Sequence, residues 1–231
     1  MKQNTKNSGQ PHRFGPHYIV FLLFLASAFS FVDRQILSIL FEPIKAEFDL
    51  SDTQLGFLGG IAFAFTYSIL GVPLAMLADR RGRKGIITAS LAIFSITTAF
   101  CGAAGSFATL ALTRIGVGIG EAGVNPASSS MIADLYPKEK RSTPMAVVTA
   151  GAPFGMLTGL IGGSLVAATW GWRAAFLLVG VPGVILAIIF WCTVREPERG
   201  SSDNSESSMR DAPSLIETFY YMWHTKTLRY L

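Results

Sequence analysis

Six long apolar tracts divide this chain, and they limit its possible folds more than any other feature. A helix needs about 20 mostly apolar residues to cross a bilayer. The tracts that meet this length lie near residues 18–40, 54–77, 85–104, 107–134, 143–169 and 173–194. Only 15% of the residues are charged, whereas soluble domains carry about a quarter. We therefore predict an all-α, multi-pass membrane protein built on a six-helix bundle.

Basic residues gather in alternate loops, which predicts the orientation of the bundle. Lys and Arg precede the first tract, separate the second from the third and the fourth from the fifth, and follow the sixth. The opposite loops hold only Lys45 and Arg173. Because positive loops stay inside, the N-terminus is expected in the cytoplasm and the protein in a cell membrane. The net charge of +4 belongs to these flanks, so no nucleic-acid partner is expected.

Changes in composition predict four segments. Residues 1–17 form a cytoplasmic tail, and residues 18–194 form the six-helix bundle. Residues 195–213 are rich in Ser, Asp, Glu and Arg, a composition typical of a solvated linker. Residues 214–231 regain aromatic and aliphatic side chains, as expected where a seventh helix begins. Cys101 and Cys192 fall in apolar tracts and indicate neither a disulfide nor a metal site.

Four charged residues lie inside the predicted spans: Asp33, Arg34, Arg114 and Glu121. A charge at membrane depth costs at least a few kcal/mol and usually marks a pairing site, a proton relay or a substrate path. The structural alternative is a buried ion pair that fixes helix register. Buried pairs often only break even in free energy, so we interpret these four charges as functional.

The fourth span has two different faces. Arg114, Gly118, Glu121, Asn125 and Ser128 share one face, and small residues occupy the opposite face. We expect the small face to pack on a neighbour and the polar face to line a water-accessible cavity. Pro126 should loosen the backbone at that cavity. In the fifth span, Gly151, Gly155, Gly159 and Gly163 form a ridge that predicts close helix packing.

Depth along the helices predicts which charges meet. Asp33 and Arg114 each lie about 10 Å from the outer end of their spans at 1.5 Å per residue, so we expect them to pair. Glu121 lies nearer the midplane. Adjacent helical residues do not face each other, so Arg34 should have a different partner from Asp33. No partner for Arg34 is evident within these six spans, and we expect it to face a substrate or a second half.

Several motifs resemble the major facilitator superfamily. Residues 75–84 read AMLADRRGRK, which is similar to the family signature between its second and third helices. The spinster-like branch is resembled more closely, by DRQIL at 33–37, SDTQLG at 51–56, GEAG at 120–123 and DLYP at 134–137. Together these motifs cover about residues 18–200.

The resemblance implies the N-terminal half of a twelve-helix transporter that works by alternating access. It makes Asp33 and Glu121 candidates for proton coupling, with Arg114 as counter-charge or anion contact, and Arg34 and Asn125 in the same cavity. Protonation of a carboxylate would free Arg114 and bias the inward–outward equilibrium. The resemblance also implies a cytoplasmic gating network, which consists of Asp79, Arg80, Gly82, Arg83, Asp134 and Arg141.

Several alternatives stay open at this stage. The substrate is expected to be an amphipathic lysolipid-like solute or an organic anion, and a sugar-acid symporter is the alternative. A non-transporting membrane scaffold or an inactive fragment represents another class. The partners expected are a small or lipid-like substrate, protons, membrane lipids, and a missing C-terminal half or second chain. The sequence contains no nucleophile–base set, metal cluster or phosphate loop, so neither an enzyme nor a cofactor is expected. A bacterial inner membrane is the expected location.

Overall fold

The computed structural model describes residues 15–80 and 82–197, and the side chains of Asp79 and Arg80 lie outside this description. All regular structure in the described residues is helical. The predicted tail is described only from Gly15, and the predicted linker only to Pro197. The expected start of a seventh helix, residues 214–231, therefore lies outside the described residues.

Six helical segments among the described residues are long and apolar enough to span a membrane, as predicted. The first three are α1 (Pro16–Ile39), a combined segment, and α5 (Arg83–Cys101). The combined segment consists of α3 (Asp52–Gly56), the π-helix η1 (Phe57–Ile61) and α4 (Ala62–Arg80). The others are α6 (Phe107–Glu121) with α7 (Val124–Leu135), α8 (Ser142–Trp170) and α9 (Trp172–Thr193). Short helices α2 (Phe41–Phe48) and η2 (Lys138–Lys140) lie at the ends.

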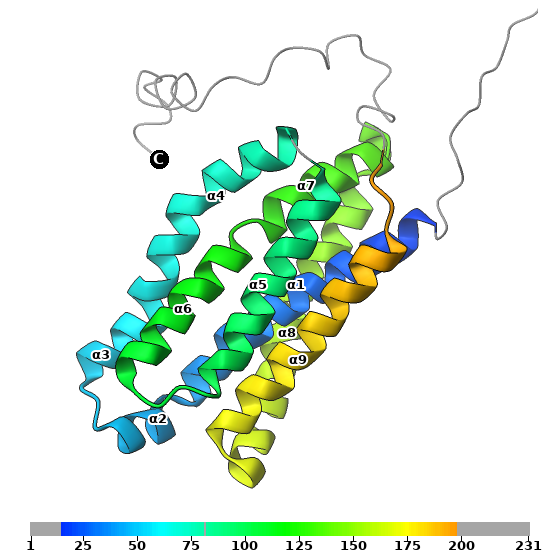
Figure 1. Cartoon of the computed structure of the whole chain (residues 1–231). Helices are drawn as coiled ribbons and strands as arrows, with labels where there is room; N and C mark the ends of the chain where they lie inside the picture. The colour runs from blue at the N-terminus through cyan, green and yellow to red at the C-terminus, as the bar shows by residue number, and fades with distance from the viewer. Residues whose placement is uncertain (1–14, 81, 198–231) are drawn as a thin grey trace, which may run out of the picture.

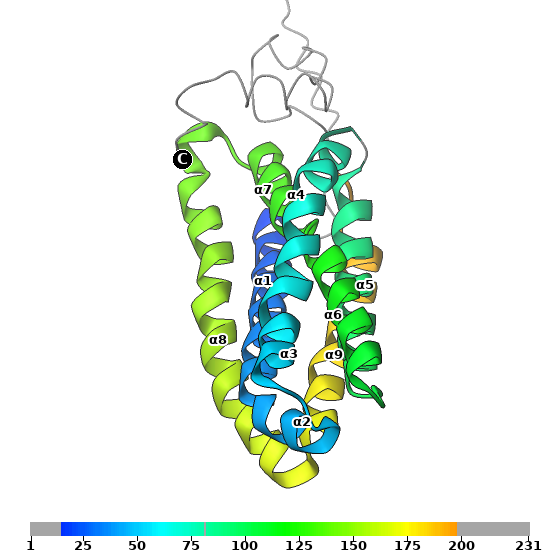
Figure 2. The ribbon, with the colours of Figure 1, turned by 90° about the vertical axis from the view of Figure 1, so that its left-hand side faces the viewer.

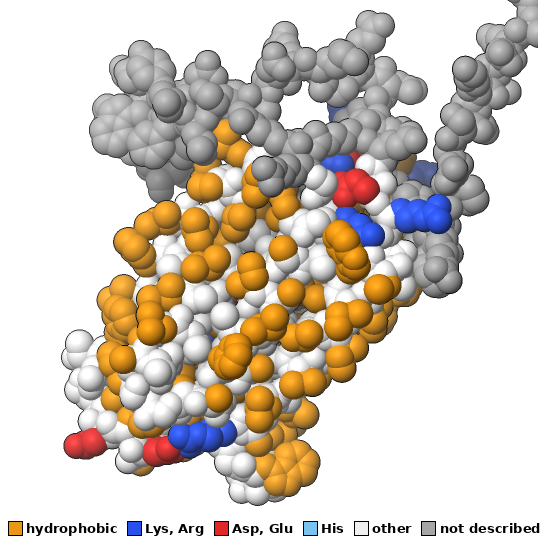
Figure 3. Space-filling view, viewed as in Figure 1, with side chains coloured by type: hydrophobic (Ala, Val, Ile, Leu, Met, Phe, Trp, Pro, Cys, Tyr) orange, Lys and Arg blue, Asp and Glu red, His pale blue; other side chains and the backbone are white. Residues whose placement is uncertain are grey.

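The six segments run side by side in alternating directions (Figures 1 and 2). Helix α1 packs along α8, while α5 packs against both α6 and α9, and α4 packs on α6. Apolar side chains cover the flank visible in Figure 3, and charged side chains gather at its two ends. We call the end with the α4–α5 connection and η2 the basic end, and the end with α2 the opposite end.

The glycine ridge of α8 lies against α1, which confirms the predicted packing. A Cβ atom on Gly151 would lie 2.6 Å from the carbonyl oxygen of Phe24, and one on Gly155 would overlap the backbone of Ala28. On Gly163 it would lie 2.7 Å from the side chain of Ile36. Only glycine allows the two backbones to approach this closely, which supports helix association where lipid provides no hydrophobic drive.

The fourth span breaks between α6 and α7, at Ala122 and Gly123. Pro126 explains the position of this break. Proline has no backbone N–H, and its ring clashes with the carbonyl four residues earlier, which here is that of Ala122. The predicted loosening is therefore confirmed. It places Glu121 at the last position of α6, beside the interruption.

Candidate functional site

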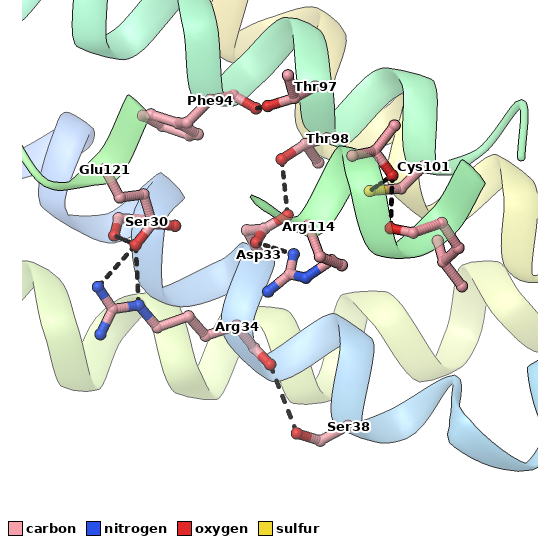
Figure 4. Close-up of polar contacts among 12 residues, drawn as sticks. Ser30, Asp33, Arg34, Ser38, Phe94, Thr97, Thr98, Cys101, Arg114 and Glu121 are labelled. Carbon is pink, nitrogen blue, oxygen red and sulfur yellow. Dashed lines mark hydrogen bonds and ion pairs between the residues drawn. The ribbon is translucent and has the colours of Figure 1, made fainter. Parts of the chain in front are cut away.

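Asp33 on α1 and Arg114 on α6 form a buried ion pair (Figure 4). The Arg114 guanidinium donates to Asp33 Oδ2 at 2.6 Å, and the hydroxyl of Thr98 on α5 donates to Asp33 Oδ1 at 2.7 Å. Asp33 and Arg114 are each only 1% exposed. The depth argument therefore predicted this pair correctly.

Arg34 and Glu121 form a second pair, which corrects the expectation that Arg34 has no partner in these spans. The Arg34 Nε and Nη2 atoms donate to Glu121 Oε2 at 2.9 and 2.6 Å, and Ser30 Oγ donates to the same oxygen at 2.7 Å. The depth argument compared backbone positions. Helical side chains tilt toward the N-terminus, so the long Arg34 side chain reaches back by one turn to the level of Ser30 and Glu121 (Figure 4).

Each pair leaves one buried polar atom without a partner among the described residues. These atoms are Glu121 Oε1 and Arg114 Nε. A buried polar atom without a hydrogen bond is costly, and such atoms in native structures need an explanation, for example a proton, a water molecule or a ligand. Glu121 Oε1 is open to a proton, whereas Oε2 accepts from Ser30 and Arg34.

Arg34 is the charge of this group that reaches open space. Its side chain is 31% exposed, whereas the Glu121 side chain is fully buried. The Arg34 guanidinium lies 4.6 Å from the centre of the Phe63 ring and 5.2 Å from that of Tyr67, in the range of cation–π contacts. A cavity of about 260 Å³ opens beside it, and Arg114 also lines this cavity. We call it the arginine cavity.

The polar face predicted for the fourth span is only partly correct. Asn125 is exposed, and its amide donates to the Tyr67 hydroxyl at 3.2 Å. Gly118, however, is buried against α4, where an added Cβ would lie 2.8 Å from the carbonyl oxygen of Phe63. The residues of this face are therefore divided between a helix contact and open space. The predicted small face packs on α5 as expected, with Gly120 against Phe94.

Part of the predicted gating network lies together at the basic end. Arg83, at the start of α5, forms an ion pair with Asp134 near the end of α7, and its Nε atom donates to Ser130 Oγ at 2.8 Å. Arg141 donates to the carbonyl oxygen of Ala133 at 2.5 Å and to that of Tyr136 at 2.9 Å, so its cation caps the C-terminus of α7. The side chains of Asp79 and Arg80 lie outside the described residues.

Glu196 belongs to the same region, although the sequence analysis assigned it to the linker. Its carboxylate accepts from the backbone N–H of Arg83 at 2.7 Å and from that of Lys84 at 2.8 Å. A Cβ atom on Gly82 would lie 3.2 Å from a Glu196 oxygen, so Gly82 leaves room for the carboxylate. The sequence contains one indication of such a contact. A helix that begins after Gly82 has no capping side chain at that position, so its first N–H groups need an acceptor from elsewhere.

Glu47 joins two elements at the opposite end and was also missed. It accepts from both guanidinium Nη atoms of Arg173 at 2.6 Å and from the indole N–H of Trp172 at 2.7 Å. These bonds, mainly those from Arg173, lower the pKa of Glu47 from 4.5 to about 2. The contacts fasten α2 to the start of α9.

Comparison with known proteins places these features in a family context. The sequence profile of the Major Facilitator Superfamily matches residues 23–230. The chain is 39% identical over 166 residues to an MFS-type efflux pump of Mycolicibacterium smegmatis, a match that covers 72% of this chain and 39% of the pump. It is 31% identical to a probable L-galactonate transporter of Escherichia coli, covering 84% of this chain and 43% of the transporter.

A solved structure shows the same arrangement of helices. It is a bacterial homolog of the human lysosomal transporter Spinster in an inward-facing, unoccupied conformation, with a TM-score of 0.75 and 34% identity. The match covers 94% of this chain and 50% of that protein. The chain thus spans about half the length, or somewhat less, of the proteins it matches. All three are described as transport proteins, in agreement with the expectation that this chain is not an enzyme.

Proposed function

The chain belongs to the Major Facilitator Superfamily, and from this membership we propose that it forms one half of a proton-coupled secondary transporter that works by alternating access. The family match and the Spinster-like fold confirm the resemblance stated from the motifs. The six apolar segments make the chain a multi-pass membrane protein. We propose a bacterial inner membrane as its location, with the basic end and the N-terminus in the cytoplasm.

The observation that carries this proposal is the pair of buried carboxylate–arginine contacts beside an open cavity. Deprotonated Glu121 holds Arg34 through two hydrogen bonds. Protonation of Glu121 removes the negative charge and frees Arg34 to bind an anionic group in the arginine cavity. Arg114 takes the same role when Asp33 is protonated. Proton binding and anion binding would then favour each other, and both would change the charge of the cavity as the protein alternates between its two states.

The substrate class follows from the same cavity. A partly exposed guanidinium against aromatic rings suits an organic anion, and an amphipathic lysolipid-like solute with an anionic group also fits this description. The alternative is a sugar acid carried by symport, and the similarity to the probable L-galactonate transporter favours it. The planar guanidinium of Arg34 can hold a carboxylate or a phosphate through two parallel hydrogen bonds. It therefore suits the anionic group of a sugar acid and that of a lysolipid-like solute.

A second half completes the cavity in this proposal. The segments that contain α4 and α8 are the least buried of the six spans. Large apolar side chains project from both, including Phe65 and Ile69 on α4 and Ile161 and Leu165 on α8. We propose that a C-terminal half, or a second chain, covers part of these faces and that membrane lipids cover the rest. The pairs of Arg83 with Asp134 and of Glu196 with the start of α5 would then hold the cytoplasmic gate.

Transport by the full-length protein in liposomes tests the proposal. We expect Glu121→Gln and Asp33→Asn each to remove most of the pH dependence of uptake between pH 5 and 8, because an amide cannot exchange a proton in this range. The matched control is Glu42→Gln, which changes an exposed carboxylate outside the spans. Full pH dependence in both variants would exclude coupling through these carboxylates.

A further inference from the structure

A second cavity, of about 310 Å³, lies between α1, α7 and α8. Its volume falls within the range of small-molecule sites, roughly 300–1,000 Å³. Ser128, Ser129 and Asn125 of α7 line one side, and Thr149 of α8 lies on another. None of the described residues that line it is charged. A ligand group that fits here is therefore uncharged, and hydroxyl and amide groups are available to bind it.

Ser128 distinguishes this cavity from an ordinary packing gap. Ser128 is 3% exposed, and its hydroxyl has no hydrogen-bond partner among the described residues. Several other hydroxyls in the spans bond to carbonyls of their own helix, as Thr97 does to Ile93 and Thr158 does to Phe154. The hydroxyls of Thr88 and Ser95 on α5 also have no partner among the described residues, but neither residue lines the cavity. Ser95 lies in a helix contact, where an added Cβ on Gly183 would overlap its hydroxyl.

The second cavity and the arginine cavity share one wall. Phe31 lines both of them, and the Arg34 guanidinium lies 5.0 Å from the centre of its ring. Asn125, at the edge of the second cavity, bonds to Tyr67, which also lies against Arg34. An organic molecule that extended past Phe31 would therefore lie beside Arg34 at one end and in the second cavity at the other.

We propose that this cavity is a neutral subsite that binds a hydroxylated segment of the substrate, with Ser128 as its specificity-determining residue. This inference rests on the proposed function, because it assumes that Arg34 holds the anionic end of the same substrate. An apolar chain in this position would leave the Ser128 hydroxyl unpaired, which is unfavourable in a buried site. The Ser128 oxygen is buried, and a ligand hydroxyl satisfies it once the serine side chain turns toward the cavity. The geometry thus favours a hydroxylated organic anion over an anion with a plain hydrocarbon tail.

Equilibrium binding to the purified full-length protein tests this subsite. The probes are gluconate and hexanoate, which are both six-carbon monocarboxylates and differ in their hydroxyl groups. We expect wild-type protein to bind gluconate at least about tenfold more tightly than hexanoate. Ser128→Ala should weaken gluconate binding about fivefold to tenfold, the range of one neutral hydrogen bond, and leave hexanoate binding within twofold. Ser95→Ala, which removes a buried hydroxyl away from the cavity, should leave both affinities unchanged.

Two further results keep the inference open to refutation. Thr149→Val, a change of similar shape on the facing helix, should also weaken gluconate selectively. The proposal is overturned if wild-type protein does not prefer gluconate, or if Ser128→Ala affects both probes equally or neither. The two proposals can also fail separately. A selective loss of gluconate affinity in Ser128→Ala would support the subsite, while unaltered pH-dependent transport in Glu121→Gln and Asp33→Asn would reject proton coupling.

Discussion

Arg114 shows how strongly one residue depends on its surroundings in this bundle. It is 1% exposed and lies against Asp33, Cys101 and the ring of Phe63, whose centre is 5.8 Å from the guanidinium. A buried pair of charges gives little net stability, but the loss of one partner leaves the other charge buried and uncompensated. The pair with Asp33 is therefore sensitive to any change that affects only one member.

We predict that Arg114→Gln destabilises the protein by about 3–5 kcal/mol, because it leaves the Asp33 carboxylate buried without its cation. The double variant Asp33→Asn with Arg114→Gln should recover a large part of this loss, since two neutral amides replace the pair. Unfolding in detergent, followed for the wild type, both single variants and the double variant, measures this coupling. If the double variant loses as much unfolding free energy as the two single variants together, the two residues act independently.

The sequence predicted one of the two ion pairs at this scale, and the reason is physical. Asp33 and Arg114 meet at similar backbone depth, so helix geometry alone pairs them. Arg34 and Glu121 do not, and their contact depends on the length and tilt of the arginine side chain. The Ser128 hydroxyl lacks a partner because of the way the surrounding side chains pack, and the spacing of residues along the chain does not determine that packing.

At the scale of elements, charged contacts fasten neighbouring segments at both ends of the bundle. Glu196 satisfies the first N–H groups of α5, and Glu47 joins α2 to α9. The helix boundaries, the break near Pro126 and the α8 glycine ridge follow from local patterns and could be predicted. Glu196 and Glu47 could not, because each contact joins segments more than 100 residues apart.

The Glu47 contact predicts a specific dependence of stability on pH. Its folded pKa of about 2 is below the ordinary value of 4.5, so its contribution is complete above about pH 4.5 and disappears as the pH falls toward 2. We expect Glu47→Gln to lower the unfolding temperature at pH 7. Between pH 4.5 and 2, the unfolding temperature of this variant should fall less than that of the wild type. Glu42→Gln, on the same helix, serves as the control. An unchanged pH profile in Glu47→Gln would show that this contact does not contribute to stability.

At the scale of the whole molecule, the described helices would form one wall of the transport path in the proposed function. The two ion pairs, the arginine cavity and the second cavity all lie among α1, η1, α4, α6, α7 and α8. Number and order of spans follow from hydropathy, and orientation is predicted from the basic loops. What covers the exposed faces of α4 and α8 could not be predicted from this sequence, because the answer depends on residues outside it.

The measurement that tests the central claim most directly compares two kinds of transport by wild-type and Glu121→Gln full-length protein in liposomes. Accumulation driven by a pH gradient needs a proton to bind and leave, whereas exchange of labelled for unlabelled solute does not. Glutamine resembles the protonated glutamic acid that leaves Arg34 free for the anion. We therefore predict that Glu121→Gln retains exchange and loses gradient-driven accumulation. Accumulation at the wild-type level would contradict the account.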